Sequence, residues 1–359
     1  MNLFDLVAKL SLDSSDFDKG LSLAKTAMSS LGTGIKKGLA AARTAVVGFG
    51  KSAVTAGLQF DTSMSQVAAT MGKSTDEIKD LREFAKKMGS ETAFSASQAA
   101  DALNYMALAG YNSKTSMSML PNVLNLAAAG SIDLAEASDM VTDAQSALGL
   151  RIDETSELVD KMAKASSKTN TSVAQLGEAM LTVGGTAKNL KGGTTELSVA
   201  LGLLADNGIK GSEGGTALRN IILSLSAPTD KAAEALKALG VEVFDEQGNM
   251  RDLESIFTDF NASLSTMSQG EQTQVLNKIF NKVDLKSVNA LLGTSVDRWD
   301  EVTTEINNAT GAAQKMADTM MDNAKGSWIE LQSALEGAAI AIGEVLIPHI
   351  KKAVEWVTE

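Results

Sequence analysis

The segment of this chain that comes nearest to a catalytic motif is AVVGFGKS, residues 45–52. It fits a relaxed phosphate-binding loop in which Ala45 replaces the first glycine. In such a loop, backbone N–H groups hold the phosphates, the lysine contacts the terminal phosphates and the hydroxyl binds magnesium. A phosphate-binding loop joins a buried strand to a helix, whereas Lys51 and Ser52 follow a basic, Ala-rich stretch with a helical pattern. The sequence therefore does not favour a nucleotide site here.

The sequence also offers little support for catalysis or metal binding by histidine, by cysteine or by paired carboxylates. The chain has one histidine, His349 beside Pro348, and no cysteine, so a three-histidine zinc site, a thiolate site and a disulfide lack ligands. A Ser-His-Asp triad would have to use His349. Two carboxylates suffice for glycoside hydrolysis, but three Trp and two Tyr are too few to line a sugar-binding cleft. We expect no enzyme activity, no catalytic residue, no metal site and no cofactor.

Glycine-rich segments offer a weaker possibility of ligand binding. Gly184-Gly185 and Gly192-Gly193 bracket a short polar segment, and four glycines occur within residues 208–215, before a predicted helix from Thr216. Such a loop could bind an anion at the helix N-terminus. The favoured interpretation is that these glycines allow positive φ angles and close helix crossings.

Composition predicts an all-α protein. Of 359 residues, 44% are apolar, but only 4% are aromatic and only three are proline. Ala, Leu and Met favour helices, whereas the β-branched and aromatic residues favour strands. No run of 18 apolar residues occurs, so the sequence predicts no ordinary membrane-spanning helix.

Charge is unevenly distributed along the chain. The net charge of −12 argues against general nucleic-acid binding. Residues 1–60 hold seven Lys or Arg and four Asp, or +3, which leaves −15 on the rest. Residues 25–51 contain five basic residues and no acidic ones. This basic segment is most simply a solvated helix face, and the alternative is a contact arm for an acidic partner or a membrane surface.

One pattern recurs after Phe60: a small polar residue, then Glu or Gln three positions later, then an apolar run at helical spacing. Each pair can cap a helix N-terminus, and a following glycine can end the helix in a left-handed turn. The pairs are Ser74 with Glu77, Ser95 with Gln98, Asp133 with Glu136, Ser172 with Gln175 and Ser268 with Glu271. The first four runs are expected to end at Gly89, Gly110, Gly149 and near Gly184.

The predicted fold is a multi-helix bundle of short antiparallel helices with a small β-hairpin and long terminal helices. Three domains are expected: an N-terminal strand (residues 6–13) and basic helical arm over 1–55, a core helical domain over 56–310, and a long helical segment over 311–359. The hairpin is predicted at residues 241–252, and Pro348 is expected to open a further helix as its first residue. The last segment is expected to lead into the rest of a longer protein.

Several segments, in order, resemble the core region of the TP901-type phage tail tape measure family. They are FDTSMSQVAATMG at residues 60–72, ALAGY at 107–111, LPNVLNL at 120–126, ADNGIKGSEGGTALR at 205–219 and DEQGNMR at 245–251. The segment at 205–219 is the most recognisable of these, and the resemblance covers roughly residues 55–350. One departure is Asn281, where the family pattern has glycine after Phe280.

The resemblance implies a structural protein that sets tail length inside the tail tube and is released when DNA is ejected. It implies a homo-oligomer that contacts the tail tube, baseplate or distal tail proteins and tail assembly chaperones. The expected location is the virion, in the tail interior, with the host cytoplasm during assembly. No catalytic residue is implied, and no specific nucleic acid is expected as a partner. The alternative is a membrane-active protein that forms a pore in the host membrane for DNA delivery.

Overall fold

The computed structural model describes the backbone of residues 39–358 and the side chains of residues 53–345 and 347. Within this part of the chain the structure is all-α, with helices α3 to α18, three short 3-10 helices and no strand. The described residues form two compact units. The first comprises those up to Met117 and those from Asn323, and the second comprises Ser118–Asp322. The predicted boundaries near residues 55 and 310 divide the chain differently and remain predictions.

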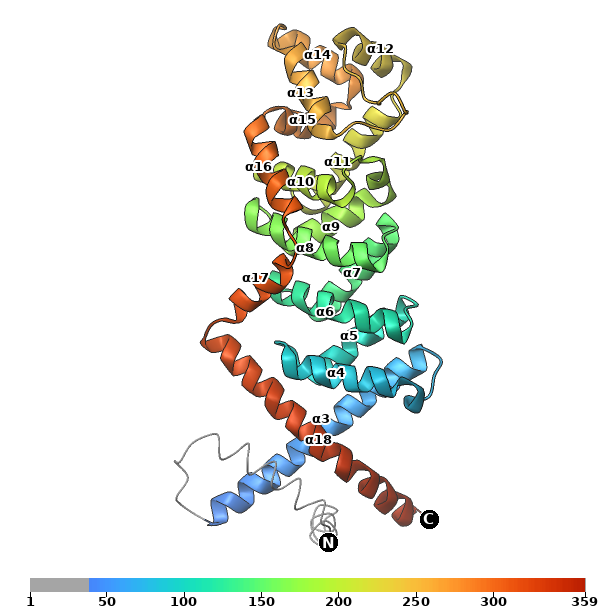
Figure 1. Cartoon of the computed structure of the whole chain (residues 1–359), viewed down its shortest axis with the longest axis vertical. Coiled ribbons are helices and arrows are strands. Elements are labelled where there is room, and N and C mark those ends of the chain that lie inside the picture. Colours follow the sequence, from blue (N-terminus) through green and yellow to red (C-terminus); the bar gives the residue numbers. More distant parts are fainter. Residues whose placement is uncertain (1–38, 359) are drawn as a thin grey trace. The chain divides into compact units, whose positions relative to one another are not determined.

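The first unit contains the two long helices. Its elements are α3 (Leu39–Thr70), η2 (Thr75–Ile78), α4 (Lys79–Glu91), α5 (Ala96–Leu108) and α18 (Ala324–Thr358). Helices α3 and α18 cross (Figure 1) and make the most extensive contact between any two elements described. Helices α4 and α5 pack on them, so that Phe60, Met64 and Leu103 are fully buried. The predicted long terminal helices are thus present, and they pack on each other.

The second unit is a succession of shorter helices, reached through α6 (Ser113–Gly130). Its elements are α7 (Leu134–Leu148), α8 (Ile152–Lys168), α9 (Val173–Val183), η3 (Gly184–Asn189), α10 (Gly193–Asp206), α11 (Gly211–Ser226), α12 (Asp230–Leu239), α13 (Leu253–Leu264), α14 (Gln269–Ile279), η4 (Lys282–Asp284), α15 (Leu285–Leu292), α16 (Val296–Asn307) and α17 (Ala312–Met321). Helices α7 to α11 stack in sequence order (Figure 1).

Packing within this stack differs from a bundle of consecutive neighbours. Helix α9 packs more extensively on α7 and α11 than on α8 or α10, and α10 packs more on α8 than on α9. Helices α16 and α17 then return along α8 and α10. Capping pairs and glycines predict where a helix begins and ends, but they carry no information about which helix it packs against.

Four of the five predicted capping pairs are confirmed at the helix starts, and at the fifth Asp133 caps the helix without a return bond from Glu136. Ser74, Ser95, Ser172 and Ser268 form reciprocal capping boxes with the predicted partner three residues later. Asp133 caps α7 through a bond from Ala135 N at 2.8 Å. The glycine ends are confirmed at Gly149, in the left-handed conformation, and at Gly110 and Gly184, which also have positive φ.

Two helix boundaries of the sequence-based prediction are wrong. Helix α4 continues past Gly89 to Glu91, because Gly89 is a packing residue: a Cβ there would lie within 2.6 Å of Ala96 backbone. Pro348 does not open a helix, since α18 runs through it, and the break lies instead at residues 322–323 between α17 and α18.

The predicted hairpin at residues 241–252 is a chain reversal without strands. One antiparallel bridge joins Phe244 and Met250, supported by bonds from Arg251 N to Val243 O and from Asp245 N to Asn249 O, both at 2.8 Å. Asp245 also accepts bonds from the amides of the turn. Helix α12 ends at Leu239 and α13 begins at Leu253, so little chain is left for a longer ladder. The predicted strand at 6–13 and the first part of the basic segment lie outside the described residues.

Candidate functional site: a groove along helix α11

The segment that resembles a phosphate-binding loop lies inside a helix. Residues 45–52 belong to α3, so their backbone N–H groups belong to the helical pattern and do not form a loop around phosphates. The side chains of Lys51 and Ser52 are outside the described ones. His349 lies within α18, and its side chain is likewise not described.

The glycines of residues 208–215 serve packing. Helix α11 begins at Gly211 and not at Thr216, and Gly208 and Gly211 have positive φ angles of 78° and 56°. A Cβ on Gly215 would lie 2.3 Å from the carbonyl oxygen of Ala179 in α9. The favoured interpretation, close helix crossing, is therefore correct for Gly215. It also explains why α9 and α11 make the most extensive contact in the second unit.

The described surface has two adjacent depressions, both bordered by α11 and the segment 277–287. The first, of about 390 Å³, is lined mainly by Glu213, Thr216, Asn220, Asp284, Lys286 and Ser287. The second, of about 440 Å³, is lined mainly by Leu223, Ser224, Ala227, Lys278, Phe280 and Lys282. The α11 residues in both recur at three- and four-residue intervals, so they form one stripe along the helix. We call the two depressions together the α11 groove.

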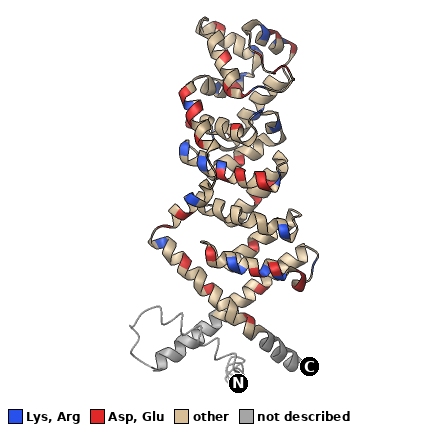
Figure 2. Cartoon of the chain, in the orientation of Figure 1, with Lys and Arg blue, Asp and Glu red and all other residues tan. Residues whose placement is uncertain are grey.

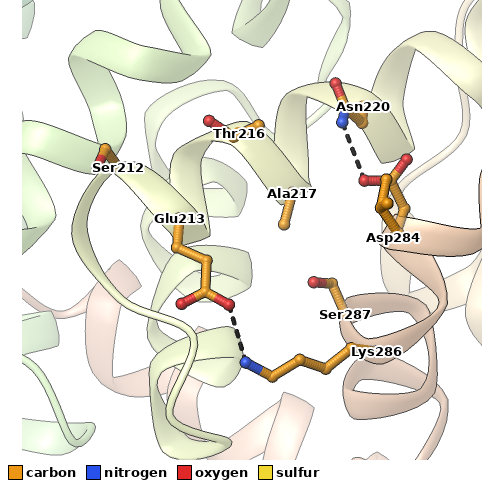
Figure 3. Close-up of a pocket in the computed structure, with 9 residues that line it drawn as sticks. Ser212, Glu213, Thr216, Ala217, Asn220, Asp284, Lys286 and Ser287 are labelled. Carbon is orange, nitrogen blue, oxygen red and sulfur yellow. Dashed lines mark hydrogen bonds and ion pairs between the residues drawn. The ribbon is translucent and has the colours of Figure 1, made fainter.

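Two polar contacts cross the first depression (Figure 3). Lys286 Nζ lies 2.8 Å from Glu213 Oε1, and Asn220 Nδ2 donates to Asp284 Oδ1 at 2.9 Å. Asp284 is only 4% exposed, and its second carboxylate oxygen has no hydrogen-bond partner. The segment 277–287, opposite α11, also packs on α13, because the ring of Phe280 lies against that of Phe260, with ring centroids 5.9 Å apart.

The groove carries a row of three lysines, Lys278, Lys282 and Lys286, which we call the lysine row. All three are exposed. Only Lys286 has an ion-pair partner among the described residues, and that partner, Glu213, is itself 61% exposed. Val283, between these lysines, is 81% exposed. Even spacing of lysines every four positions was a sequence signal for this surface, but the elements that bear them, α14, η4 and α15, are separate.

Elsewhere in the second unit, ion pairs join helices that are distant in sequence. Arg298 of α16 donates to Asp206 at the end of α10 at 2.9 Å and to the carbonyl of Lys168 at the end of α8 at 2.7 Å. Hydrogen bonds to Asp206 and then to Glu301 raise the pKa of Arg298. Glu305 adds pairs with Lys164 and Lys168. These contacts tie α16 to the C-terminal parts of α8 and α10.

Among the residues whose side chains are described, Glu196 is the one buried glutamate whose pKa is displaced. It lies in the first turn of α10 and accepts bonds from Gly192 N at 2.7 Å and from Leu253 N, at the start of α13, at 2.5 Å. Burial raises its pKa, although these two bonds act in the opposite direction. Its carboxylate thus caps the N-termini of two helices, which is a structural role.

The described residues contain no group of three His, Cys, Asp or Glu side chains placed to hold a metal ion. Among the helices described, none has a stretch that is both apolar enough and long enough to cross a membrane. Lys and Arg are interspersed with Asp and Glu along these helices (Figure 2).

Comparison with known proteins identifies the class of protein. Residues 82–281, more than half of the chain, match the family of phage-related minor tail proteins. The chain belongs to this family, whose members are structural components of phage tails.

Two curated relatives narrow the comparison. The chain is 31% identical to the tape measure protein of Pneumococcus phage Dp-1 over 373 aligned residues, which cover 100% of the chain and 32% of the relative. It is 29% identical to the probable tape measure protein of Escherichia phage P2, over 98% of the chain and 43% of that protein. The chain thus spans less than half the length of either relative. No solved structure matches it.

Proposed function

We propose that this chain is a folded region of a phage tail tape measure protein that takes part in tail assembly and the setting of tail length. The observation that carries the proposal is the similarity to two tape measure proteins over essentially the whole chain, together with membership of the minor tail protein family. As in the interpretation of the sequence, the protein acts inside the tail tube and is released at DNA ejection.

This folded region would not itself be the part of the protein whose length sets the length of the tail. A single helix of 359 residues would span about 540 Å, at roughly 1.5 Å per residue. The longest described helix, α18, has 35 residues, or about 52 Å. The described helices are packed against one another and none is longer than this, so most of the measuring length would lie in other parts of the relatives.

The partners and domains follow from this role. We propose a homo-oligomer that contacts the tail tube, baseplate or distal tail proteins and tail assembly chaperones, in the host cytoplasm during assembly and then in the virion. Within it, residues 1–55 act as an arm, 56–310 as the core and 311–359 as the link to further chain. Limited proteolysis that cuts mainly near residues 55 and 310 would support this division, and cuts elsewhere would contradict it.

The test of the function is an in-frame deletion of the core, residues 56–310, in the phage gene, with tails examined by electron microscopy. Loss of tails, or tails of altered length, is expected. Tails of unchanged number and length would overturn the proposal. A deletion of equal size in a region outside this chain is the matched control, because it separates the effect of shortening from loss of this fold.

A further inference from the structure

A second charged surface of the same unit complements the α11 groove. Helix α7 is buried along most of its circumference, and its exposed residues are Glu136, Asp139, Asp143 and Ser146. Their spacing of three, four and three residues places them on one line along the helix. We call Glu136, Asp139 and Asp143 the acidic stripe. No ion pair of the described residues includes any of them.

The acidic stripe is electrostatically unfavourable in the isolated chain. Asp139 and Asp143 are four residues apart on one helix face, where like charges repel. Partial burial, and then the charge of Asp143, raises the pKa of Asp139. A cation placed beside them would relieve both effects, but no lysine or arginine of the described chain pairs with them.

The lysine row carries the complementary positive charge, most of which is unpaired among the described contacts. Lys278 and Lys282 have no ion pair among the described contacts, and the pair of Lys286 with Glu213 is exposed enough to exchange at little cost. The α11 stripe that faces the row runs from Ser212 to Ala227, about 22 Å. The acidic stripe runs from Glu136 to Asp143 along α7, about 10 Å, so it fits within the length of the groove.

Helix α7 lies toward the other end of the second unit from α14 and α15 (Figure 1) and makes no extensive contact with either, so a contact between the two surfaces would join two copies. We propose that the acidic stripe of one copy docks against the lysine row of a second copy, with Val283 and Leu223 covered in the contact. The two surfaces differ, so the association is head-to-tail: it closes into a ring if the rotation between copies allows and otherwise extends.

This inference deepens the proposed function, because it gives the homo-oligomer an interface. Tail length in the phage tests the proposed function, and association of the purified chain tests the proposed interface. Failure of one proposal is therefore distinguishable from failure of the other.

The experiment is a charge exchange on the full 359-residue chain. One variant reverses the stripe (Asp139→Lys with Asp143→Lys), and the other reverses the row (Lys278→Glu with Lys282→Glu). Alone, each variant presents like charges on both surfaces and should associate at least about tenfold more weakly than the original chain. Mixed in equal amounts, they offer opposite charges wherever one variant meets the other, so association should return.

Association is measured by sedimentation velocity at several concentrations and at low and high salt, which should weaken it. Lys231→Glu with Lys237→Glu, on the exposed face of α12, makes the same charge change elsewhere in the unit and should leave association unchanged. Helical content by circular dichroism checks that each variant folds, and the neutral pairs Asp139→Asn with Asp143→Asn and Lys278→Gln with Lys282→Gln replace any that does not.

Three results would each overturn the proposal. They are an original chain that stays monomeric at every concentration, single variants that associate as the original does, and a mixture that does not regain association.

Discussion

Gly57 of α3 and Gly343 of α18 lie backbone to backbone where the two long helices cross. A Cβ built on Gly57 would lie 3.0 Å from the Cα of Gly343, and one built on Gly343 would lie 2.7 Å from the carbonyl oxygen of Ala53. Neither helix can carry a side chain at this point without moving apart from the other. Phe60 and Ile340, each three residues from one of these glycines, are buried, so such a movement would disturb packed positions.

Gly343→Ala should destabilise the protein, because the obstructing atom is backbone and cannot move aside. Added volume in a packed contact costs about 1–3 kcal/mol, measured as the free energy of unfolding in urea. The matched control is Gly337→Ala in the same helix, where nothing lies within 4 Å of the built Cβ. There alanine should be neutral or stabilise by up to about 1 kcal/mol through helix propensity. Equal effects of the two substitutions would contradict the role assigned to the crossing.

Glu344, next in the chain, joins α18 to α4. It lies 3.0 Å from Arg82 Nε and 2.8 Å from Lys86 Nζ, and Arg82 also contacts Asp61 of α3 at 3.1 Å. Glu344→Gln should destabilise the protein by about 1–2 kcal/mol, more than an exposed pair would, because the Arg82 side chain is only 17% exposed and would keep an incompletely paired charge. The measurement is thermal unfolding.

The control for Glu344 is Glu91→Gln. Among the described residues Glu91 pairs only with Lys87, at 3.9 Å, and both side chains are more than half exposed. Its loss should change the free energy of unfolding by less than about 0.5 kcal/mol. If the two substitutions lower the free energy of unfolding by similar amounts, the ion pairs of Glu344 between the helices contribute no more than an exposed pair.

Helix starts and ends were the most predictable part of this fold. Ser95 and Gln98, or Ser268 and Glu271, specify a capping box through contacts within one turn, so local sequence is enough to identify it. Gly89 shows the limit. The same residue type that ends α7 at Gly149 is used inside α4 for contact with Ala96, and only the tertiary structure distinguishes the two uses.

The candidate surface was less predictable than the helices. Its lysines and the α11 stripe are separated by about fifty residues, and Phe280, which lines the groove, packs on Phe260 of α13. Likewise, nothing near Glu196 in the sequence indicates that its carboxylate caps Leu253. The family, in contrast, was recognisable from ordered short motifs, because those motifs include residues such as Gly215 that packing fixes.

Glu196 predicts an unusual dependence of stability on pH. Since its folded pKa is raised above the ordinary value of 4.5, the folded state binds the proton more tightly than the unfolded state. Its contribution to stability is therefore fully present below about pH 4.5 and is lost as the pH rises through the folded pKa. The stability of the original chain relative to Glu196→Gln should fall as the pH is raised from about 4 to about 7. Urea unfolding at several pH values measures this difference.

Asp252, at the start of α13, should show the opposite sign. Burial acts to raise its pKa, but hydrogen bonds from Ser255 outweigh burial, and its pKa is lowered from the ordinary value of 3.8. Its contribution is present above about pH 3.8 and is lost as the pH falls through the folded pKa. The loss of stability in Asp252→Asn should therefore shrink on acidification. If the stability of the original chain relative to each variant changes with pH in the same direction for both residues, the role assigned to Glu196 is wrong.

Gly215 provides the most direct test of why the segment 205–219 has its glycines. A Cβ there would lie 2.3 Å from the carbonyl oxygen of Ala179 and 2.9 Å from its Cα, both backbone atoms of α9. Gly215→Ala should therefore force α9 and α11 apart and cost about 1–3 kcal/mol in urea unfolding. Gly270→Ala, in the first turn of α14 with nothing near its Cβ, is the control and should cost nothing. If Gly215→Ala unfolds like the original chain, the glycine is not required for packing, and ligand binding by the start of α11 becomes the better explanation of its place in the segment.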